Sequence, residues 1–207
     1  MNVAKFLLVD IALLLGGSLL LLLQGAQGSP LSLGKFSTNK TADHTLTVLP
    51  DLKALLDLEL SARKNGSGIE FDALNGLWKF VTVWKQGTDK EDSTSSFLLR
   101  VFSASLELRD ETTREGLSAF DVTSSIRFGA LSIRFIGSGQ LIGPQPILSF
   151  FFERIELKLS DSVLFSRLLS IPDEKNRPFF GLIATGNSGQ WLSARGRGGG
   201  LALWQKL

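Results

Sequence analysis

Phe120–Leu141, FDVTSSIRFGALSIRFIGSGQL, is the stretch that decides the fold. Side chains of an extended chain alternate between two faces, so a period of two in hydrophobicity indicates a half-buried β-strand. One face of each half of this stretch carries large apolar residues: Phe120, Val122, Ile126 and Phe128 in the first half, and Leu131, Ile133 and Phe135 in the second. Ser132 and Arg134 take the opposite face of the second half. The pattern predicts two neighbouring strands.

The same kind of pattern continues on both sides of this stretch. Short runs rich in Phe, Val, Ile and Leu, bounded by Gly, Pro, Asp, Asn or Ser, occur at 74–85, 97–109, 120–128, 130–141, 147–159, 162–169, 179–184, 190–195 and 201–206. Consecutive strands without long helices between them favour an antiparallel meander. Closure of such a meander into a barrel leaves no free edge. We therefore expect a mainly β domain over residues 69–207, an antiparallel β-barrel of about eight strands.

The composition excludes several classes of function. The chain has 207 residues, no Cys and one His, which excludes thiol chemistry, Cys-type zinc sites and an imidazole metal cluster. Lys and Arg number 22 against 20 Asp and Glu, too small a surplus for a nucleic-acid-binding surface. The aromatic content is almost entirely Phe, 15 residues with no Tyr, which suits a dry interior or a lipid-facing wall. We expect no metal and no cofactor.

The N-terminal region is apolar on all sides. Phe6–Leu23, FLLVDIALLLGGSLLLLL, lacks the polar stripe of an amphipathic helix. Its length is at the lower limit for a membrane span, and Gln24–Gly28 also resembles the region where a signal peptide is cleaved. We expect residues 1–28 to be a membrane-seeking segment, either a signal peptide or an anchor; a helix buried in the globular domain is the alternative.

Residues 29–68 are predicted to form a linker and one short helix. The linker contains Gly, Ser, Thr, Asn and Pro, and also the single histidine, His44, which we interpret as a solvated linker residue. The helix begins after Pro50-Asp51, where leucines alternate with charged residues. Asn65-Gly66-Ser67-Gly68 ends it.

Residues 147–159 indicate what the barrel encloses. One face carries Leu148, Phe150 and Phe152 followed by Arg154, Glu156 and Lys158, and the other carries Ile147, Phe151, Ile155, Leu157 and Leu159. A strand with this pattern would leave a covered part of the barrel toward water. An eight-stranded barrel can be filled by its own side chains or hold one small ligand, and both alternatives stay open. If a ligand is bound, it is apolar, and the residues expected to line it are Phe80, Phe128, Phe135, Phe150, Phe152 and Trp191.

No motif of a catalytic or nucleotide site is convincing. Gly137–Gly143 is followed at once by Pro144-Gln145-Pro146, which prevents the helix that a dinucleotide loop must open. Arg195–Gly200, RGRGGG, is interpreted as a turn between the last two strands. Glu153 and Glu156 differ by an odd number of positions and would point to opposite faces of a strand, so they form no acid/base pair. We expect that the protein is not an enzyme.

Several segments carry a resemblance to a known family. Gly76-Leu77-Trp78, Phe97–Arg100, Ile126–Phe135, Gly137–Pro144 and Trp191–Gly200 resemble the plastid-lipid-associated protein (fibrillin) family, in particular its cyanobacterial-type members. The resemblance implies a lipocalin-like barrel that binds lipids or isoprenoids, lies at thylakoid membranes or plastid lipid globules (plastoglobules), has no enzymatic activity and takes part in photoprotection. It also implies barrel closure by Gly76 and Trp78 on the first strand and by Arg195 and Arg197 near the last, with Arg195 resting on the Trp78 ring.

Sequence and resemblance together lead to two functional hypotheses. The first is a non-catalytic lipid- or isoprenoid-binding or structural protein at a thylakoid, plastid or cyanobacterial membrane, whose partners are an apolar ligand and the membrane surface. The second is an adaptor with a solid barrel that docks on a membrane complex. Neither hypothesis predicts an oligomeric state.

Overall fold

The computed structural model describes residues 48–207 except 88–89, 111–118, 144–145 and 187. Its strands are β1 (Gly76–Trp84), β2 (Ser105–Asp110), β3 (Ala119–Phe128), β4 (Leu131–Ile142), β5 (Ile147–Leu159), β6 (Ser162–Leu168), β7 (Phe179–Thr185), β8 (Trp191–Gly196) and β9 (Leu201–Lys206). Its helices are α2 (Leu52–Asn65), α3 (Phe71–Leu74), α4 (Ser93–Val101) and the 3₁₀ turn η1 (Glu174–Asn176).

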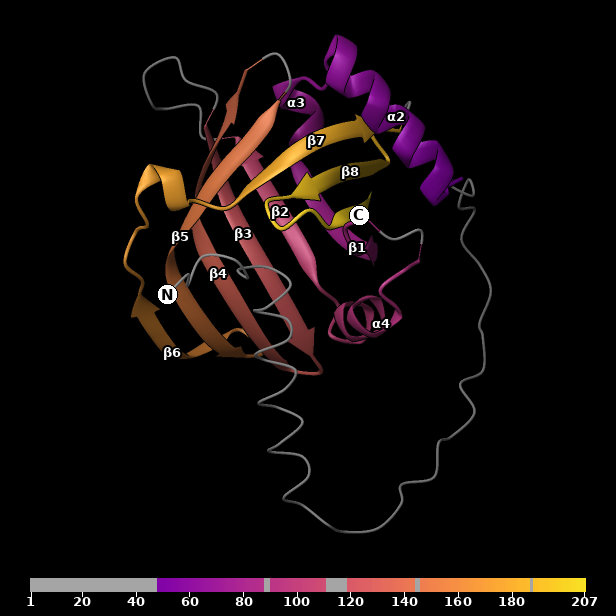
Figure 1. Ribbon diagram of the computed structural model, residues 1–207. Helices are drawn as coiled ribbons and strands as arrows, with labels where there is room; N and C mark the ends of the chain where they lie inside the picture. The colour runs from indigo at the N-terminus through magenta and orange to yellow at the C-terminus, as the bar shows by residue number, and fades with distance from the viewer. Residues whose placement is uncertain (1–47, 88–89, 111–118, 144–145, 187) are drawn as a thin grey trace, which may run out of the picture.

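Eight of these strands close into an antiparallel barrel (Figure 1). The ring runs β4-β3-β2-β1-β9-β8-β7-β5, and β5 pairs with β4 to complete it. β6 lies outside the ring and pairs with the second half of β5. The expected mainly β fold with a barrel of about eight strands is thereby confirmed.

The predicted strands match the observed ones closely, with one exception. Residues 97–109 were expected to form a single strand, but their first part belongs to α4. Asp92 begins this helix, because its carboxylate accepts a hydrogen bond from the Ser95 backbone N–H at 3.2 Å. Ser103, with φ of 44°, then turns the chain into β2. The apolar run Phe97–Val101 is therefore helical, and the strand predicted for it is wrong.

The barrel interior is filled with apolar side chains over most of its length. Trp78, Phe120 and Phe150 are completely or almost completely buried there. The other buried members of this core include Phe80, Leu106, Leu108, Val122, Leu148, Phe152, Phe180, Leu182, Leu192, Ala194, Ala202 and Trp204, and the eighth ring strand, β4, adds the partly buried Phe135 and Leu141. At one end of the barrel α3 closes the interior, since Leu74 is fully buried and the Phe71 ring stacks on Phe120 with 3.9 Å between centroids.

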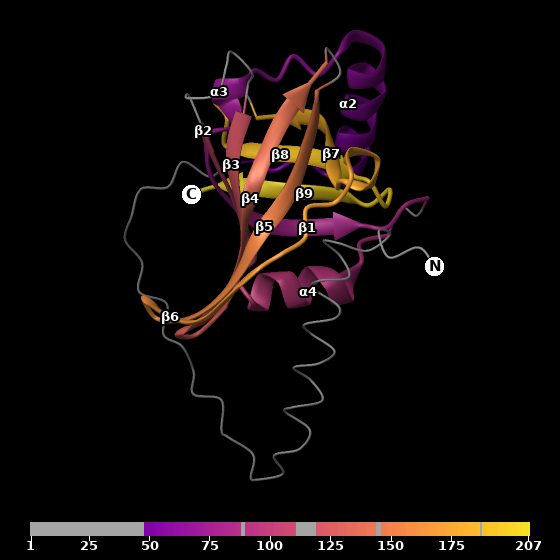
Figure 2. The same cartoon turned by 90° about the vertical axis from the view of Figure 1, so that its left-hand side faces the viewer.

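The strand β5 is longer than the barrel wall and changes partner along its length. Near its start it pairs with β7 through Ile147, Leu148 and Ser149. From Arg154 onward it pairs with β6 instead. Its other edge pairs with β4 throughout, so the β3–β6 strands continue past the barrel as a curved sheet (Figure 2). We call this continuation the sheet extension.

Two longer helices flank the barrel at different places. The helix α2 agrees with the helix predicted after Asp51, and it packs on the outside of the barrel, where Leu55 joins a second cluster with Ile183, Ala184 and Leu201. Figures 1 and 2 place α4 at the end opposite α3, beside the sheet extension. Among the described helices, none combines the length and hydropathy needed to cross a membrane. The predicted membrane-seeking segment and His44 lie outside the described residues.

Candidate functional site: the α4 end of the barrel

A small cavity lies inside the barrel beneath α4, with a volume of about 100 Å³. Its walls come from five strands, from α4 and from the connection between α4 and β2. The lining is mainly apolar, with three serines: Phe80, Leu99, Ala104, Ser105, Leu106, Ser124, Ser125, Ile126, Phe180, Ala202 and Trp204. Because α3 and the aromatic core fill the other end, this is the end at which the interior approaches the surface.

The helix α4 turns polar side chains toward the barrel. Ser96 is fully buried, and its hydroxyl lies 3.1 Å from the Thr82 hydroxyl and accepts a hydrogen bond from the Val83 N–H at 3.1 Å. Arg100 reaches across to the Val81 carbonyl at 3.1 Å and to the Glu91 carboxylate at 3.2 Å. These contacts fix α4 to β1 by hydrogen bonds.

Two carboxylates at the start of α4 are held in the charged form. Hydrogen bonding from the Thr82 hydroxyl, and then from Ser96 and Arg100, lowers the pKa of Glu91 despite an opposing effect of burial. For Asp92 the largest single effect, burial, raises the pKa, but hydrogen bonds from Ser95 and the charge of Lys85 together lower it. Both groups therefore accept hydrogen bonds as carboxylates at neutral pH, which keeps the helix start fixed.

The outward side of α4 carries two large apolar residues beside the polar Ser93, Thr94 and Arg100. Phe97 is 60% exposed and Val101 is 44% exposed. At the end of the helix the Phe102 ring contacts the Phe128 ring edge-on, with 5.8 Å between centroids. Phe128 itself is 56% exposed, at the turn between β3 and β4. Phe97 and Val101 thus depart from the arrangement expected of a surface helix, which buries its apolar side, whereas Leu99 of the same helix follows it by packing against the core.

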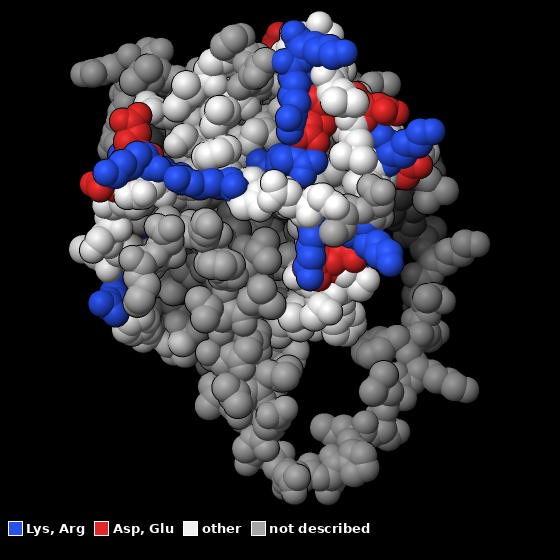
Figure 3. Space-filling view, in the orientation of Figure 1, with Lys and Arg blue, Asp and Glu red and all other residues white. Residues whose placement is uncertain are grey.

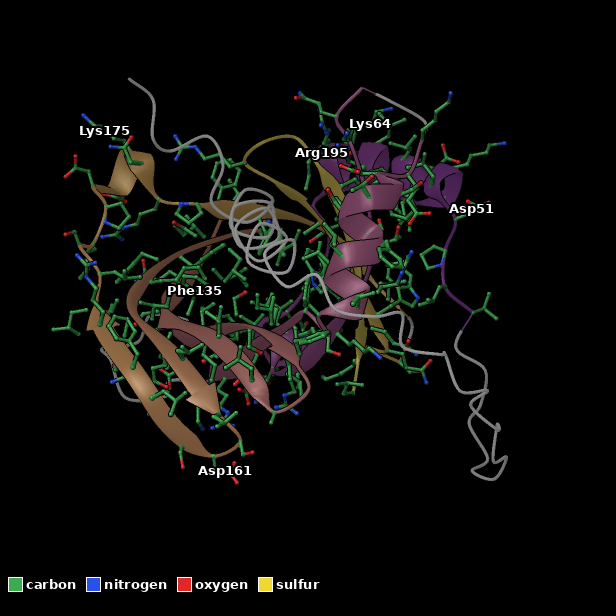
Figure 4. All side chains as sticks on the ribbon, turned by 90° about the horizontal axis from the view of Figure 1, so that it is seen from below. Asp51, Lys64, Phe135, Asp161, Lys175 and Arg195 are labelled. Atoms are coloured by element: carbon green, nitrogen blue, oxygen red, sulfur yellow. The ribbon has the colours of Figure 1, made fainter. Side chains whose placement is uncertain are left out.

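The sheet extension carries apolar side chains on the face that continues the barrel interior. A bulge in β5 changes its pairing with β4: Phe152 is opposite Gly137, but Arg154 is opposite Ile136. The bulge shifts the alternation by one residue, so that Ile155 is opposite Phe135 and Leu157 is opposite Ile133. The Phe135 ring in turn lies 5.5 Å from the interior Phe152 ring. Figure 4 shows the sheet curving around Phe135.

This bulge corrects an expectation about β5. The alternation counted from the sequence placed Arg154, Glu156 and Lys158 on the face of Phe152. In the structure that face is continued by Ile155, Leu157 and Leu159, each opposite an apolar residue of β4. The parity argument that separated Glu153 from Glu156 therefore does not hold across the bulge. Glu156 instead pairs with Arg154 at 3.1 Å.

The predicted ligand-lining residues occupy three different places. Phe80, Phe150 and Phe152 are buried in the barrel, and of these Phe80 lines the cavity. Phe135 lies where the interior meets the sheet extension, and Phe128 lies at its tip. Trp191 does not face the interior: it packs on the outer cluster beneath α2, because Leu192 and Ala194 are the residues of β8 that point inward.

The predicted contact between the Trp78 ring and the Arg195 guanidinium is wrong, because another cation lies over the ring. Trp78 is fully buried, and its indole N–H donates to the Leu74 carbonyl at 2.7 Å. The cation over its ring is Lys206, whose Nζ lies 5.1 Å from the centroid. Gly76 leaves room for this side chain, because a Cβ there would lie 2.6 Å from the Lys206 Cε. Alternation along β8 directs Arg195 outward.

Arg195 and Arg197 instead border a groove on the outside of the barrel. The groove has a volume of about 330 Å³ and lies between α2 and the outer side of β7 and β8. Arg195 donates to Glu59 of α2 and to the Gly199 carbonyl, and Arg197 donates to the Arg177 and Lys175 carbonyls at 2.7 and 2.9 Å. Figure 3 shows positive and negative side chains lying together over α2 and the adjoining strands. These arginines hold parts of the chain together.

One further feature of this end has a local sequence signal, and one feature of the outer groove has none. Asp92-Ser93-Thr94-Ser95 is a helix-start sequence, and it would have identified α4 and its exposed Phe97. Glu59 was seen only as one charge on an amphipathic helix, and its pairing with Arg195 depends on the tertiary fold. Within the described part of the chain, no group of three or more His, Cys, Asp or Glu is placed to hold a metal ion.

The α4 end therefore combines a small, mainly apolar cavity, an apolar sheet face and a helix with exposed apolar residues. In comparisons with known proteins, no protein-family model and no curated protein sequence matched this chain.

Proposed function

We propose that this protein is a non-catalytic binder of an apolar lipid or isoprenoid at a membrane of the thylakoid type, as its resemblance to the plastid-lipid-associated proteins implies. One observation carries the proposal. The mainly apolar lining of the barrel interior continues from the cavity, past Ser124, through Ile126 and Phe135, onto the sheet extension. An apolar chain bound along this path would remain in contact with hydrocarbon over its whole length.

The size of the cavity restricts how such a ligand binds. Pockets that enclose a small molecule have volumes of about 300–1,000 Å³, and the cavity measures about 100 Å³. It accepts one end of an acyl or isoprenoid chain, while the rest of the chain lies against Ile133, Phe135 and Leu157. A bulky polar head group remains outside, near α4.

The proposal is tested with the full chain purified from the membranes of its host. Extraction and mass spectrometry identify co-purifying lipid, and titration with a carotenoid, a quinone and a fatty acid measures affinity. Ser124→Leu fills the cavity with an apolar side chain and should weaken binding at least about tenfold, a loss of about 1.4 kcal/mol. Ser138→Leu makes the same change on the outer face of β4, opposite Asp121 and Phe151, and should leave binding unchanged.

Two results would contradict this function. One is a barrel that co-purifies without lipid and ignores all three ligands. The other is equal weakening by Ser124→Leu and Ser138→Leu, since a general loss of structure would then explain both.

A second candidate function is favoured by the filled interior. Trp78, Phe120 and Phe150 are completely or almost completely buried in the deep half of the barrel, as expected of an adaptor with a solid barrel that acts through its surface. Co-purification of one stoichiometric protein partner without lipid would support the adaptor over the binder.

A further inference from the structure

Exposed apolar side chains gather at the α4 end of the molecule. Phe97 and Val101 project from α4, and Phe128 lies at the β3–β4 turn. The β5–β6 hairpin adds Leu159, Leu164 and Phe165, with exposures of 48%, 58% and 52%. We call these six residues the apolar end surface. Figures 1 and 2 agree that α4 and β6 lie at the same end, away from α2 and α3.

The elements of this surface are anchored mainly by polar and backbone contacts, with the Phe128–Phe102 ring contact as the one described exception. α4 is attached through Ser96 and Arg100, so Phe97 and Val101 take no part in holding it. β6 is attached through its backbone ladder to β5, and each of its side chains is exposed. Burying these side chains against another body would therefore cost no contact within the protein.

Basic side chains accompany the apolar ones. Arg127 precedes Phe128, Lys158 precedes Leu159, and Arg167 lies on β6. None of the three forms an ion pair within the described part of the chain. One carboxylate, Asp161, lies at the hairpin turn, as Figure 4 shows. Because neighbouring residues of a strand point to opposite faces, Arg127 and Lys158 lie on the reverse face of the sheet tip from Phe128 and Leu159. Exposed apolar side chains with cations near them are typical of protein surfaces that enter the interface of an anionic bilayer.

We propose that the apolar end surface docks on a lipid bilayer with anionic head groups and inserts Val101 and Leu164 into its interface. This inference rests on the proposed function, because docking brings the path for the apolar ligand against the lipid. Three separate elements form the surface: one side of α4, the β3–β4 turn and the β5–β6 hairpin. It is not a groove that would receive a peptide.

The length of chain before the described residues is compatible with this orientation. Residues 24–47 separate the apolar run Phe6–Leu23 from Val48. A fully extended chain of that length reaches at most roughly 80 Å. A membrane-seeking N-terminus and the apolar end surface can therefore reach the same bilayer.

The absence of cysteine makes a site-resolved experiment possible. Single cysteines are introduced into the full chain by Val101→Cys and Leu164→Cys at the apolar end surface. Matched controls are Ile142→Cys at the other end of β4 and Leu60→Cys on α2, with exposures of 49% and 59% against 44% for Val101 and 58% for Leu164. Each variant carries an environment-sensitive fluorophore and is mixed with phosphatidylcholine vesicles with or without phosphatidylglycerol.

We expect a blue shift and quenching by spin-labelled lipid at positions 101 and 164, stronger with phosphatidylglycerol, and neither response at 60 and 142. Equal responses at all four positions, or none at 101 and 164 while the protein still sediments with vesicles, would overturn the proposal. A concentration-dependent blue shift without vesicles would overturn it in favour of contact between two copies of the chain.

Ligand binding by Ser124→Leu, compared with the vesicle experiment, distinguishes a failure of this inference from a failure of the proposed function. If Ser124→Leu lowers ligand binding while the labels stay in water on vesicles, the binder stands and the docking surface is wrong. If the labels enter the bilayer but no ligand binds, the docking surface stands and the proposed function is wrong.

Discussion

Glu59 and Arg195, separated by 136 positions in the sequence, form a two-pronged ion pair between α2 and the outer face of the barrel. The Arg195 Nε donates to one carboxylate oxygen at 2.6 Å, and a terminal N–H donates to the other. Arg63 donates to the same carboxylate at 2.8 Å. Since Glu59 is buried, its charge depends on these donors, and the pair fixes where α2 lies on the barrel.

Replacing this carboxylate should loosen α2. Glu59→Gln removes the charge and leaves Arg195 with the Gly199 carbonyl, so we expect a loss of about 1–3 kcal/mol in the free energy of unfolding. Urea denaturation measures it. The exposed pair of Glu107 with Arg109 gives the control, and Glu107→Gln should cost less than about 1 kcal/mol. Equal losses for both variants would show that Glu59 has no special role.

The same carboxylate should make stability depend on pH in acid. Hydrogen bonding from Arg195, partly opposed by burial, lowers the pKa of Glu59 from its ordinary 4.5. A group with a lowered folded-state pKa stabilises the fold above its unfolded pKa, and this contribution disappears as the pH falls through the folded pKa. The free energy of unfolding should therefore decrease below about pH 4.5, and less steeply in Glu59→Gln, where Glu91 and Asp92 still contribute. Parallel pH profiles for wild type and variant would contradict this.

The contact between β4 and β5 should be intolerant of a side chain at Gly137. A Cβ there would lie 2.0 Å from the Phe151 carbonyl oxygen, which is backbone and cannot rotate away. We expect Gly137→Ala to cost about 3 kcal/mol or more. At Gly181 the nearest atom to a Cβ would be the Arg195 carbonyl oxygen at 3.7 Å, so Gly181→Ala should change the melting temperature little. Similar melting temperatures for the two variants would be incompatible with this geometry.

The attachment of α4 should depend on one hydroxyl. Ser96→Ala leaves the Val83 N–H without its acceptor and the Thr82 hydroxyl without its neighbour, at a cost of about 1–3 kcal/mol. Amide hydrogen exchange of Ser93–Val101 should become faster, while that of β3 and β4 stays unchanged. Thr94→Ala, at an exposed position of the same helix, should leave the exchange unchanged. Uniform acceleration throughout the barrel would rule out a local role.

The Trp78 side chain should stabilise the fold more through its burial than through its contact with the Lys206 cation. Trp78→Ala should lower the free energy of unfolding by about 3–5 kcal/mol. Lys206→Met keeps the stem and removes the charge over the ring, and should cost about 0.5–1 kcal/mol. Calorimetry on both variants measures the two losses of stability. A larger loss for Lys206→Met than for Trp78→Ala would contradict this prediction.

The barrel could be predicted from the sequence because apolar and polar residues alternate along several of its strands. Along β3 and β4 the apolar period and the bounding turns depend only on neighbours in the chain, and the predicted ranges agree with the structure. α4 was missed because Phe97–Val101 is apolar on its exposed side, where the usual relation between hydropathy and burial is reversed. The start signal at Asp92 is local and could have been recognised.

The candidate site was harder to predict because it depends on departures from regular geometry. The bulge after Phe152 changes which side chains face inward, and no residue type marks it. The partners of Trp78 and Arg195 come from α3, α2 and β9, so they depend on how distant segments pack. Phe80 lines the cavity and Phe135 lies against Phe152, whereas Trp191 lies in the outer cluster, since the two sides of β8 are both covered and hydropathy does not distinguish them.

The junction of β5 with β7 has a consequence for how the ring opens. It consists of the register pairs at Ile147, Leu148 and Ser149 and two flanking backbone hydrogen bonds, from Phe150 to Pro178 and from Leu182 to Pro146, whereas β5 and β4 pair along their full length. Thermal breathing should therefore begin at this short seam and convert the ring into an open sheet, with the other ladders intact. A transient slit at that position would give hydrocarbon chains a sideways route into the core, independent of the end covered by α4.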